Sequence, residues 1–261
     1  MPNAPIPPTY RAPRLFVEGA LDAGAPLELP PEQARYLLTV MRRPSGAPVV
    51  AFNGRDGAWL TRLEPQGRKG AVLTPERLIR PQPTDAQTAT APWLVFATVK
   101  RQATELMIEK ATELGCARYI PVRAKRSNTE RINQARLERI AIEAAEQSER
   151  LTVPSFAPLQ ALDAVFADWP RNRLLIVGDE SGAAPPAAET LAAHAPGPFA
   201  FIVGPEGGFA PEELDAMRQL DFAVCIGLGP RVLRAETAAI VGLTLAQAAL
   251  GDFKTARSAS G

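Results

Sequence analysis

The segment FAFIVGPEGGF, residues 199–209, joins five apolar residues directly to a loop that contains three glycines, a proline and an acid. A continuous apolar run of this length is typical of a β-strand that is covered on both faces, as in a parallel sheet. In open α/β sheets, ligands bind at the carboxyl ends of the strands. Glycines there let the backbone approach a ligand closely, so the segment predicts a pocket lined by main chain.

Strands and helices alternate around this segment. Apolar runs predict further strands at 93–99, 117–122, 173–178 and 222–227. Helical spacing of apolar residues predicts helices at about 102–115, 133–149 and 236–250. The alternation predicts the α/β class, with a mainly parallel sheet and helices on both faces.

A second glycine-rich loop, GLGPRVLRAET at residues 227–237, follows the strand predicted at 222–227. The two loops are predicted to be adjacent and to frame one crevice. Neither GxGxxG nor GxxxxGK[ST] occurs, so the usual dinucleotide and P-loop signatures are absent from the sequence. Glu212 and Glu213 in the helix after the first loop argue against a phosphate at its N-terminus.

The N-terminal third of the chain has a different pattern. Short apolar runs between residues 14 and 78 are separated by turn signals and predict a small β-rich domain. One short helix is predicted at about 31–43. The stretch from residue 81 to 92 is rich in proline, threonine and alanine and is interpreted as a linker. We therefore expect domains at 1–80 and 93–261.

Composition narrows the chemistry. A single histidine, His194, cannot build a multi-histidine metal site, so no metal is expected. Cys116 and Cys225 form neither a CxxC motif nor a disulfide framework. No apolar stretch reaches the length of a membrane span, and the N-terminus lacks the apolar core of a secretory signal, so we expect a cytoplasmic protein.

The net charge of +1 hides an uneven distribution. Residues 100–150 hold 11 Lys+Arg against 8 Asp+Glu, whereas residues 151–261 hold 7 against 12. An anionic partner is therefore expected at the first 150 residues. Basic residues are densest at 118–131, where a solvated basic face is an equal alternative.

The two loops together, GPEGGF and LGPRVLRAETA, resemble the paired signature of the RsmE family, the ribosomal-RNA uridine N3-methyltransferases of the SPOUT superfamily. EKATELG at 109–115, EQS at 146–148 and RLFV at 14–17 also match. The resemblance implies an N-terminal PUA-like β-barrel that binds RNA and a C-terminal SPOUT-type α/β domain with a deep trefoil knot. It also implies a homodimer that methylates N3 of a specific uridine in 16S rRNA of the small ribosomal subunit, in rRNA processing and ribosome biogenesis.

The same resemblance implies where S-adenosylmethionine (SAM) binds. The residues that it assigns to the cofactor are Gly204, Pro205, Glu206, Gly207, Gly208, Ile226, Leu228, Gly229, Val232 and Leu233. The sequence departs from the family pattern at Arg35, Arg101, Glu149 and Ala210. Glu149 replaces a glycine, and Ala210 replaces a Ser or Thr that would cap a helix.

Methylation of uridine N3 requires loss of its proton. Arg234 is the candidate for stabilising the resulting anion, and Glu236 is the candidate base. Two structural alternatives are an Arg231–Glu206 ion pair across the loops and a capping role for Glu236.

Contacts to RNA phosphates are expected from Arg11, Arg14, Lys100, Lys125 and Arg126. The alanine-rich helix at 236–250, with Gly242 in its interior, suits either a dimer interface or a buried position within the chain. The alternative function is a non-catalytic RNA-binding ribosome-assembly factor with the same fold.

Overall fold

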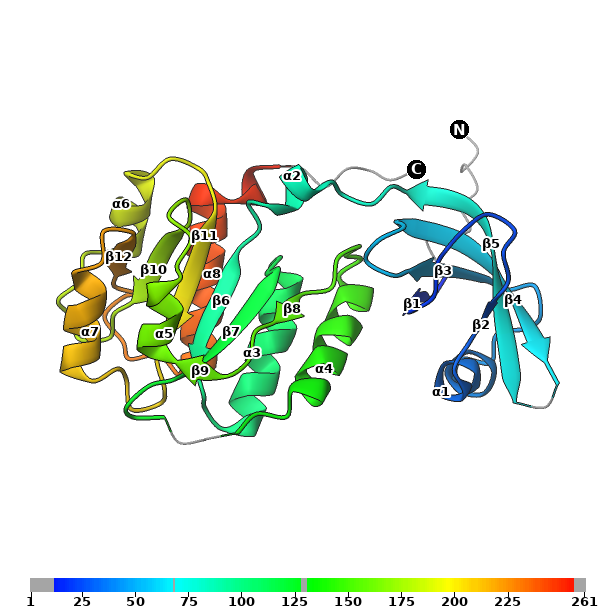
Figure 1. Ribbon diagram of the computed structural model, residues 1–261, viewed down its shortest axis with the longest axis horizontal. Coiled ribbons are helices and arrows are strands. Elements are labelled where there is room, and N and C mark those ends of the chain that lie inside the picture. The colour runs from blue at the N-terminus through cyan, green and yellow to red at the C-terminus, as the bar shows by residue number, and fades with distance from the viewer. Residues whose placement is uncertain (1–11, 68, 128–130, 256–261) are drawn as a thin grey trace. The chain divides into compact units, whose positions relative to one another are not determined.

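The apolar run at residues 199–203 forms strand β11 (Phe199–Val203), near the centre of a seven-stranded sheet (Figure 1). These features belong to a computed structural model, which describes residues 12–67, 69–127 and 131–255. The spatial order of the strands is β12-β10-β11-β6-β7-β8, with β9 beside β7, and every pairing is parallel. The other strands are β6 (Trp93–Ala97), β7 (Arg118–Arg123), β8 (Ser155–Phe156), β9 (Gln160–Ala161), β10 (Leu174–Gly178) and β12 (Ala223–Ile226). The predicted α/β class with a mainly parallel sheet is confirmed.

Helices cover both faces of this sheet, as predicted. Side chains alternate between the faces along each strand, so that Phe199 and Phe201 lie in one core cluster and Ala200 and Ile202 lie in the other. The first face carries α3 (Arg101–Glu113), α4 (Gln134–Gln147), α6 (Ala187–Ala192) and α8 (Ala235–Leu250). The second carries α5 (Leu162–Ala167) and α7 (Pro211–Arg218). None of the helices in the described ranges combines the length and the apolar character that a bilayer span requires.

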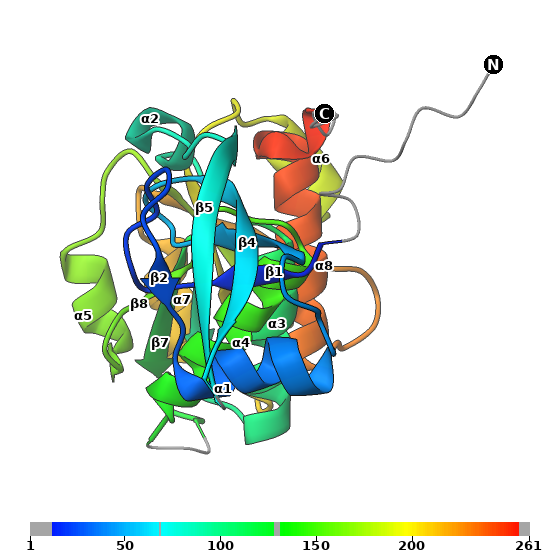
Figure 2. The same ribbon diagram turned by 90° about the vertical axis from the view of Figure 1, so that its right-hand side faces the viewer.

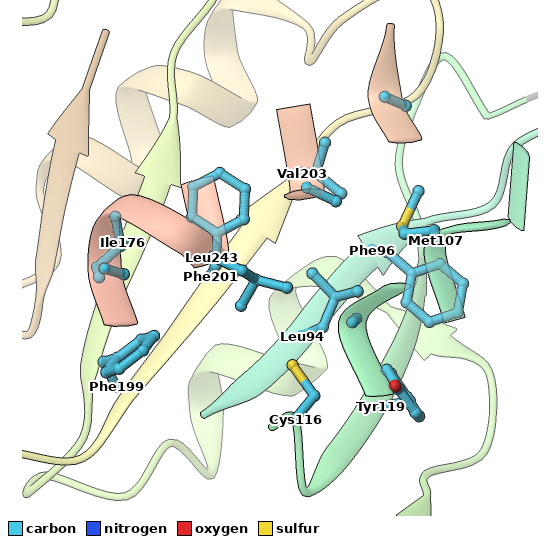
Figure 3. Close-up of a cluster of buried hydrophobic side chains, with 14 of the residues drawn as sticks. Leu94, Phe96, Met107, Cys116, Tyr119, Ile176, Phe199, Phe201, Val203 and Leu243 are labelled. Atoms are coloured by element: carbon cyan, nitrogen blue, oxygen red, sulfur yellow. The ribbon is translucent and has the colours of Figure 1, made fainter. Parts of the chain in front are cut away.

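Close packing of α8 on β11 depends on a glycine. Gly242 lies in α8 directly over the ring of Phe201, and a Cβ atom at residue 242 would meet three ring carbons of Phe201 at 2.2 to 2.6 Å. Figure 3 shows Phe201 beside Leu243 in this cluster. The helix therefore approaches the sheet more closely than any larger residue at position 242 allows.

A small β-sheet forms the first part of the chain. Its strand order is β1-β3-β4-β5-β2, with β1 parallel to β3 and the other pairs antiparallel. The elements are β1 (Arg14–Phe16), β2 (Leu27–Glu28), α1 (Pro31–Arg35), β3 (Pro48–Phe52), β4 (Ala58–Gln66) and β5 (Gly70–Arg80). Figure 2 shows α1 beside this sheet, where Ala34 and Leu37 join the core. The predicted helix is present, but it continues as a π-helix (η2, Tyr36–Val40).

The chain forms two compact units, and one boundary falls inside α4. Residues 12–84 and 145–153 belong to the first unit, and residues 85–144 and 154–255 to the second. Within the first unit, the Phe16 amide donates to Glu146 Oε1 at 2.8 Å, and Arg14 Nη2 donates to the Arg150 carbonyl at 3.0 Å. The stretch predicted as a linker contains a short helix, α2 (Asp85–Thr88).

The structure shows the local setting of two departures from the family pattern. Glu149 has φ of 59°, the left-handed conformation that favours glycine, and this accounts for the glycine expected there. Arg101 forms an ion pair with Glu105, with Nε and Oε1 2.7 Å apart, at the start of α3.

We predict that Gly242→Ala lowers the free energy of unfolding by about 1–3 kcal/mol, because the added methyl group overpacks the Phe201 ring. In a helix interior, alanine is more favourable than glycine by about 1 kcal/mol. A loss of stability in Gly242→Ala would therefore be strong evidence that the added methyl group overpacks the core. Chemical denaturation measures it. Gly197→Ala is the control, since the nearest atom to its added Cβ is 4.0 Å away; equal stability of the two variants would contradict the packing argument.

Candidate active site

A cleft of about 950 Å³ opens at the carboxyl ends of β10, β11 and β12. Its walls are the loops that follow these three strands, together with the N-terminus of α3 and the first turn of α8. Of the predicted cofactor residues, the cleft is lined by Gly204, Pro205, Glu206, Gly208, Leu228, Gly229, Val232 and Leu233. The other two do not line it: Ile226 is fully buried, and the Gly207 carbonyl accepts a hydrogen bond from Arg126.

The two glycine-rich loops line one cleft, but the strands that they follow are not neighbours in the sheet. β10 lies between β11 and β12, so a third loop, at 178–186, forms part of the cleft wall. This loop contributes Asp179 and Glu180. Sequence reasoning missed it, although the signal was present: GDESG follows the apolar run of β10 as GPEGGF follows β11.

Three side chains hold the loop after β11 in place. Glu180 Oε1 accepts a hydrogen bond from the Phe209 amide at 2.9 Å. Arg126 Nη1 donates to the Gly207 carbonyl at 2.9 Å, and Glu206 Oε1 accepts from the Lys100 amide at 3.0 Å. Because these anchors come from three separate parts of the second unit, we expect the loop to be ordered before any ligand binds.

Glycine is required within this loop. Gly208 has φ of 69°, and a Cβ there would lie 2.1 Å from Glu180 Oε1. Phe209, the next residue, is 2% exposed and anchors the loop in the core between the sheet and α7.

The loop after β12 is joined to the loop after β10. The Gly227 amide donates to the Pro185 carbonyl at 2.8 Å, and the Ala187 amide donates to the Gly227 carbonyl at 3.1 Å. Beyond this bridge, Gly229 has φ of 104° and Val232 is 87% exposed. The loop is thus fixed at its start, while its apolar tip lies at the mouth of the cleft.

The two candidate catalytic residues lie at the start of α8. Arg234 is the residue before the first helical position, Glu236 is in the first turn, and both line the cleft. Neither side chain makes a hydrogen bond or ion pair with another residue of the described ranges, and Glu236 does not cap the helix. No ion pair joins Arg231 to Glu206 in the described ranges, and Glu206 Oε1 accepts a hydrogen bond from the Lys100 amide.

Asp179 is a buried acid that the sequence reading did not single out. Its Oδ2 lies 2.7 Å from Arg218 Nη2, and its Oδ1 accepts from the Ser181 amide at 2.8 Å. Burial alone would raise the pKa of Asp179, but hydrogen bonds from Ser181 and Arg218 outweigh it and the pKa is lowered. Burial and the Asp179 charge raise the pKa of the neighbouring Cys225 thiol.

The residues predicted to bind RNA differ in exposure and in the contacts that their side chains make. Lys100 lines the cleft with an exposed side chain. Lys125 Nζ pairs with Glu212 Oε1 at 2.5 Å, and Arg126 holds the loop after β11. Arg14 stacks 4.9 Å from the Phe52 ring centroid, and burial followed by the nearby Arg80 lowers its pKa to about 10. Arg11 lies outside the described residues.

Ala210 leaves α7 without a side-chain cap, and Glu213 takes over part of that role. Its Oε2 accepts from the Ala210 amide at 2.8 Å, while its Oε1 accepts from the Lys125 amide at 2.8 Å. One carboxylate therefore stabilises the helix start and ties it to the segment after β7.

Comparison with known proteins defines the class of protein to which this fold and cleft belong. Residues 87–247 match the family model described as an RNA methyltransferase domain, so the chain is an RNA methyltransferase by family. It is 30% identical over 233 residues to ribosomal RNA small subunit methyltransferase E of Rickettsia conorii, an alignment covering 88% of this chain and 93% of the relative. The chain belongs to the ribosomal RNA small subunit methyltransferase E family, which confirms the resemblance drawn from the two loops.

Solved structures agree. Ribosomal RNA small subunit methyltransferase E of Neisseria gonorrhoeae, crystallised with S-adenosyl methionine, superposes with a TM-score of 0.80 at 26% identity, covering 93% of this chain and 100% of that one. A methyltransferase of Legionella pneumophila in complex with the cofactor SAM gives 0.78 at 27% identity, with the same coverage.

We predict that Gly208→Ala weakens SAM binding at least about tenfold, because the methyl group displaces the Glu180 carboxylate and strains a left-handed backbone. Isothermal titration calorimetry measures the effect. Gly24→Ala is the control: φ is 74° there, but no atom lies within 4 Å of the added Cβ. Wild-type affinity in Gly208→Ala would contradict the described loop geometry.

Proposed function

We propose that the chain transfers a methyl group from SAM to N3 of a uridine in 16S rRNA. The observation that carries the proposal is the single cleft in which both signature loops and both candidate catalytic residues meet. Membership of the family and the SAM-bound relatives support the cofactor and the rRNA substrate.

The cleft fits SAM in size and in character. Its volume of about 950 Å³ lies within the range of small-molecule sites. Gly204, Gly208 and Gly229 expose backbone where larger residues would project into it or clash. We assign the nucleoside to these glycine-rich walls and to the apolar side chains of Leu228, Val232 and Leu233.

The reaction requires a base and an anion-stabilising group. Bound SAM supplies a strongly electrophilic methyl group, whereas uridine N3 becomes a good nucleophile only after its proton is removed. We assign proton removal to the Glu236 carboxylate and stabilisation of the negative charge on the uracil carbonyl oxygens to the Arg234 guanidinium. Support comes from their position on the cleft wall and from the absence of competing partners among the described residues.

We predict that Glu236→Gln lowers kcat by about 100-fold or more, because general base catalysis contributes about 10²–10⁴-fold, while SAM affinity stays within about twofold. Methyl incorporation from radiolabelled SAM into undermodified small subunits measures kcat, and mass spectrometry of the RNA locates the methyl group on N3. Glu189→Gln, on the exposed side of α6, is the control. Wild-type turnover in Glu236→Gln would refute the base assignment.

The same assay separates the enzyme from the alternative function. A non-catalytic ribosome-assembly factor would bind RNA without transferring label at any SAM concentration. Label at a position other than uridine N3 would show that the protein is a methyltransferase but would contradict the proposed specificity for N3.

We assign contacts with RNA phosphates to the five basic residues predicted from the sequence: Arg11, Arg14, Lys100, Lys125 and Arg126. Of these, Lys100 lines the cleft. The N-terminal region, residues 1–80, is proposed as the PUA-like RNA-binding domain, joined through 81–92 to the methyltransferase domain at 93–261. The target uridine must be unpaired or flipped out of its stack to enter the cleft. The protein is expected to act in the cytoplasm, with the ribosomes.

We predict that RNA affinity falls steeply with salt and that Lys100→Ala reduces the slope of log Kobs against log [salt] by about one. Filter binding at several salt concentrations measures the slope. Lys254→Ala, whose ammonium donates to the Ala249 carbonyl, is the control. An unchanged slope in Lys100→Ala would remove this residue from the RNA interface.

The trefoil knot is also proposed. Its support is that the chain leaves the edge strand β12, pairs at Gly227 with the loop after β10, and then packs α8 against β11 and α3. A knot further requires that the chain threads through that loop, and we propose that the segment between β12 and α8 does so.

A homodimer is proposed on the basis of α8. This helix is apolar along most of its length, and Ile240, Val241 and Leu245 remain only half-buried.

We predict that sedimentation equilibrium gives twice the chain mass of 28.0 kDa and that Val241→Glu shifts the protein toward the monomer, because it places a charge in an apolar contact. A wild-type monomer at micromolar concentration would contradict the dimer.

A further inference from the structure

The Glu180 side chain, which helps to hold the loop after β11, also lines the cleft. It follows β10 by two residues, and its Oε1 accepts from the Phe209 amide at 2.9 Å. The carboxylate occupies the space that a side chain at residue 208 would need. It therefore lies directly against the backbone of the loop assigned to the nucleoside.

Only one carboxylate oxygen of Glu180 is used. The Phe209 bond involves Oε1, and among the described residues Glu180 makes no other hydrogen bond and no ion pair. The Glu180 side chain is exposed. The basic residues Lys100, Arg231 and Arg234 also line the cleft, but none of them pairs with Glu180. A carboxylate held at one oxygen presents the other as a fixed acceptor, and no cationic side chain of residues 12–67, 69–127 and 131–255 pairs with it.

The sheet topology indicates which donors this acceptor fits. β10 is the neighbour of β11, and β11 leads into the glycine-rich loop. In Rossmann folds that bind dinucleotides, an acid that follows the glycine-rich loop by about 20 residues accepts a hydrogen bond from the ribose 2′-hydroxyl, and we extend this by analogy to an acid beside the glycine-rich loop of this sheet. Glu180 has this placement, and vicinal hydroxyls supply the two donors that a carboxylate can accept together.

We propose that Glu180 binds the ribose hydroxyls of SAM and makes the cleft selective for ribonucleosides. This inference rests on the proposed placement of SAM in the cleft. It goes beyond that placement because it assigns one part of the cofactor to one side chain and predicts discrimination against deoxyribose.

A double-mutant cycle between ligand and protein tests the contact. The ligands are methylthioadenosine, which lacks the amino-acid part of SAM, and its 2′,3′-dideoxy analogue. We expect wild-type protein to bind the ribose form at least about tenfold more tightly, as a charge-assisted hydrogen bond predicts. In Glu180→Ala the two affinities should agree within about twofold, since any loosening of the loop affects both ligands equally.

Glu180→Gln separates recognition from loop support. Glutamine retains an oxygen for the Phe209 amide but removes the charge, so a purely structural role predicts wild-type affinity for methylthioadenosine. Ribose recognition predicts a loss of about tenfold in calorimetry. Glu189→Gln, outside the cleft, should behave as wild type.

The outcomes distinguish this inference from the function on which it rests. If wild-type protein binds SAM but Glu180→Ala keeps the full preference for ribose, the Glu180 assignment is wrong and the cofactor site stands. If Glu180→Gln binds methylthioadenosine as wild type does, Glu180 serves the loop alone. If wild-type protein binds neither SAM nor methylthioadenosine, the proposed site itself fails.

Discussion

The hydrogen bond between the Phe209 amide and the Glu180 carboxylate is the contact on which the cleft depends. A loop with three glycines has high conformational entropy when free, and a ligand that had to order it would bind more weakly. In this chain the cost is met on folding: Glu180 and Arg126 bind the loop backbone, Glu206 binds α3, and the Phe209 ring is buried in the core. The loop can therefore expose its backbone to a ligand without being flexible.

The sheet explains how distant parts of the chain reach this loop. Because all the strands of the larger sheet are parallel, their carboxyl ends lie along one edge, and the loops after β7, β10, β11 and β12 emerge there together. Gly242 lets α8 approach β11 closely, and the start of that helix lies at the cleft with Arg234 and Glu236. Stability and function are thus coupled, since the packing that holds α8 also positions the two candidate catalytic residues.

Much of this could be predicted from the sequence, because apolar runs and glycine-rich loops have local signatures. The strands at 93–97, 174–178 and 199–203 and the terminal helix are where the periodicity places them. Strand order was not predictable, since it depends on contacts between residues far apart in sequence, and for this reason the loop at 178–186 was missed. Side-chain partners were equally hidden: no signal in the sequence indicates that the Arg126 guanidinium donates to the Gly207 carbonyl. Glu149 replaces the glycine of the family pattern but keeps the left-handed backbone conformation that glycine favours.

The central claim is that the loop after β11 is ordered before the cofactor binds. Amide hydrogen exchange in the free protein, followed by NMR, tests it most directly at Phe209, whose amide donates to Glu180. We expect this amide to be protected without SAM and to lose protection in Glu180→Ala. Exchange at the unprotected rate in the free wild-type protein, with protection appearing only after SAM is added, would show that the ligand orders the loop and would contradict the claim.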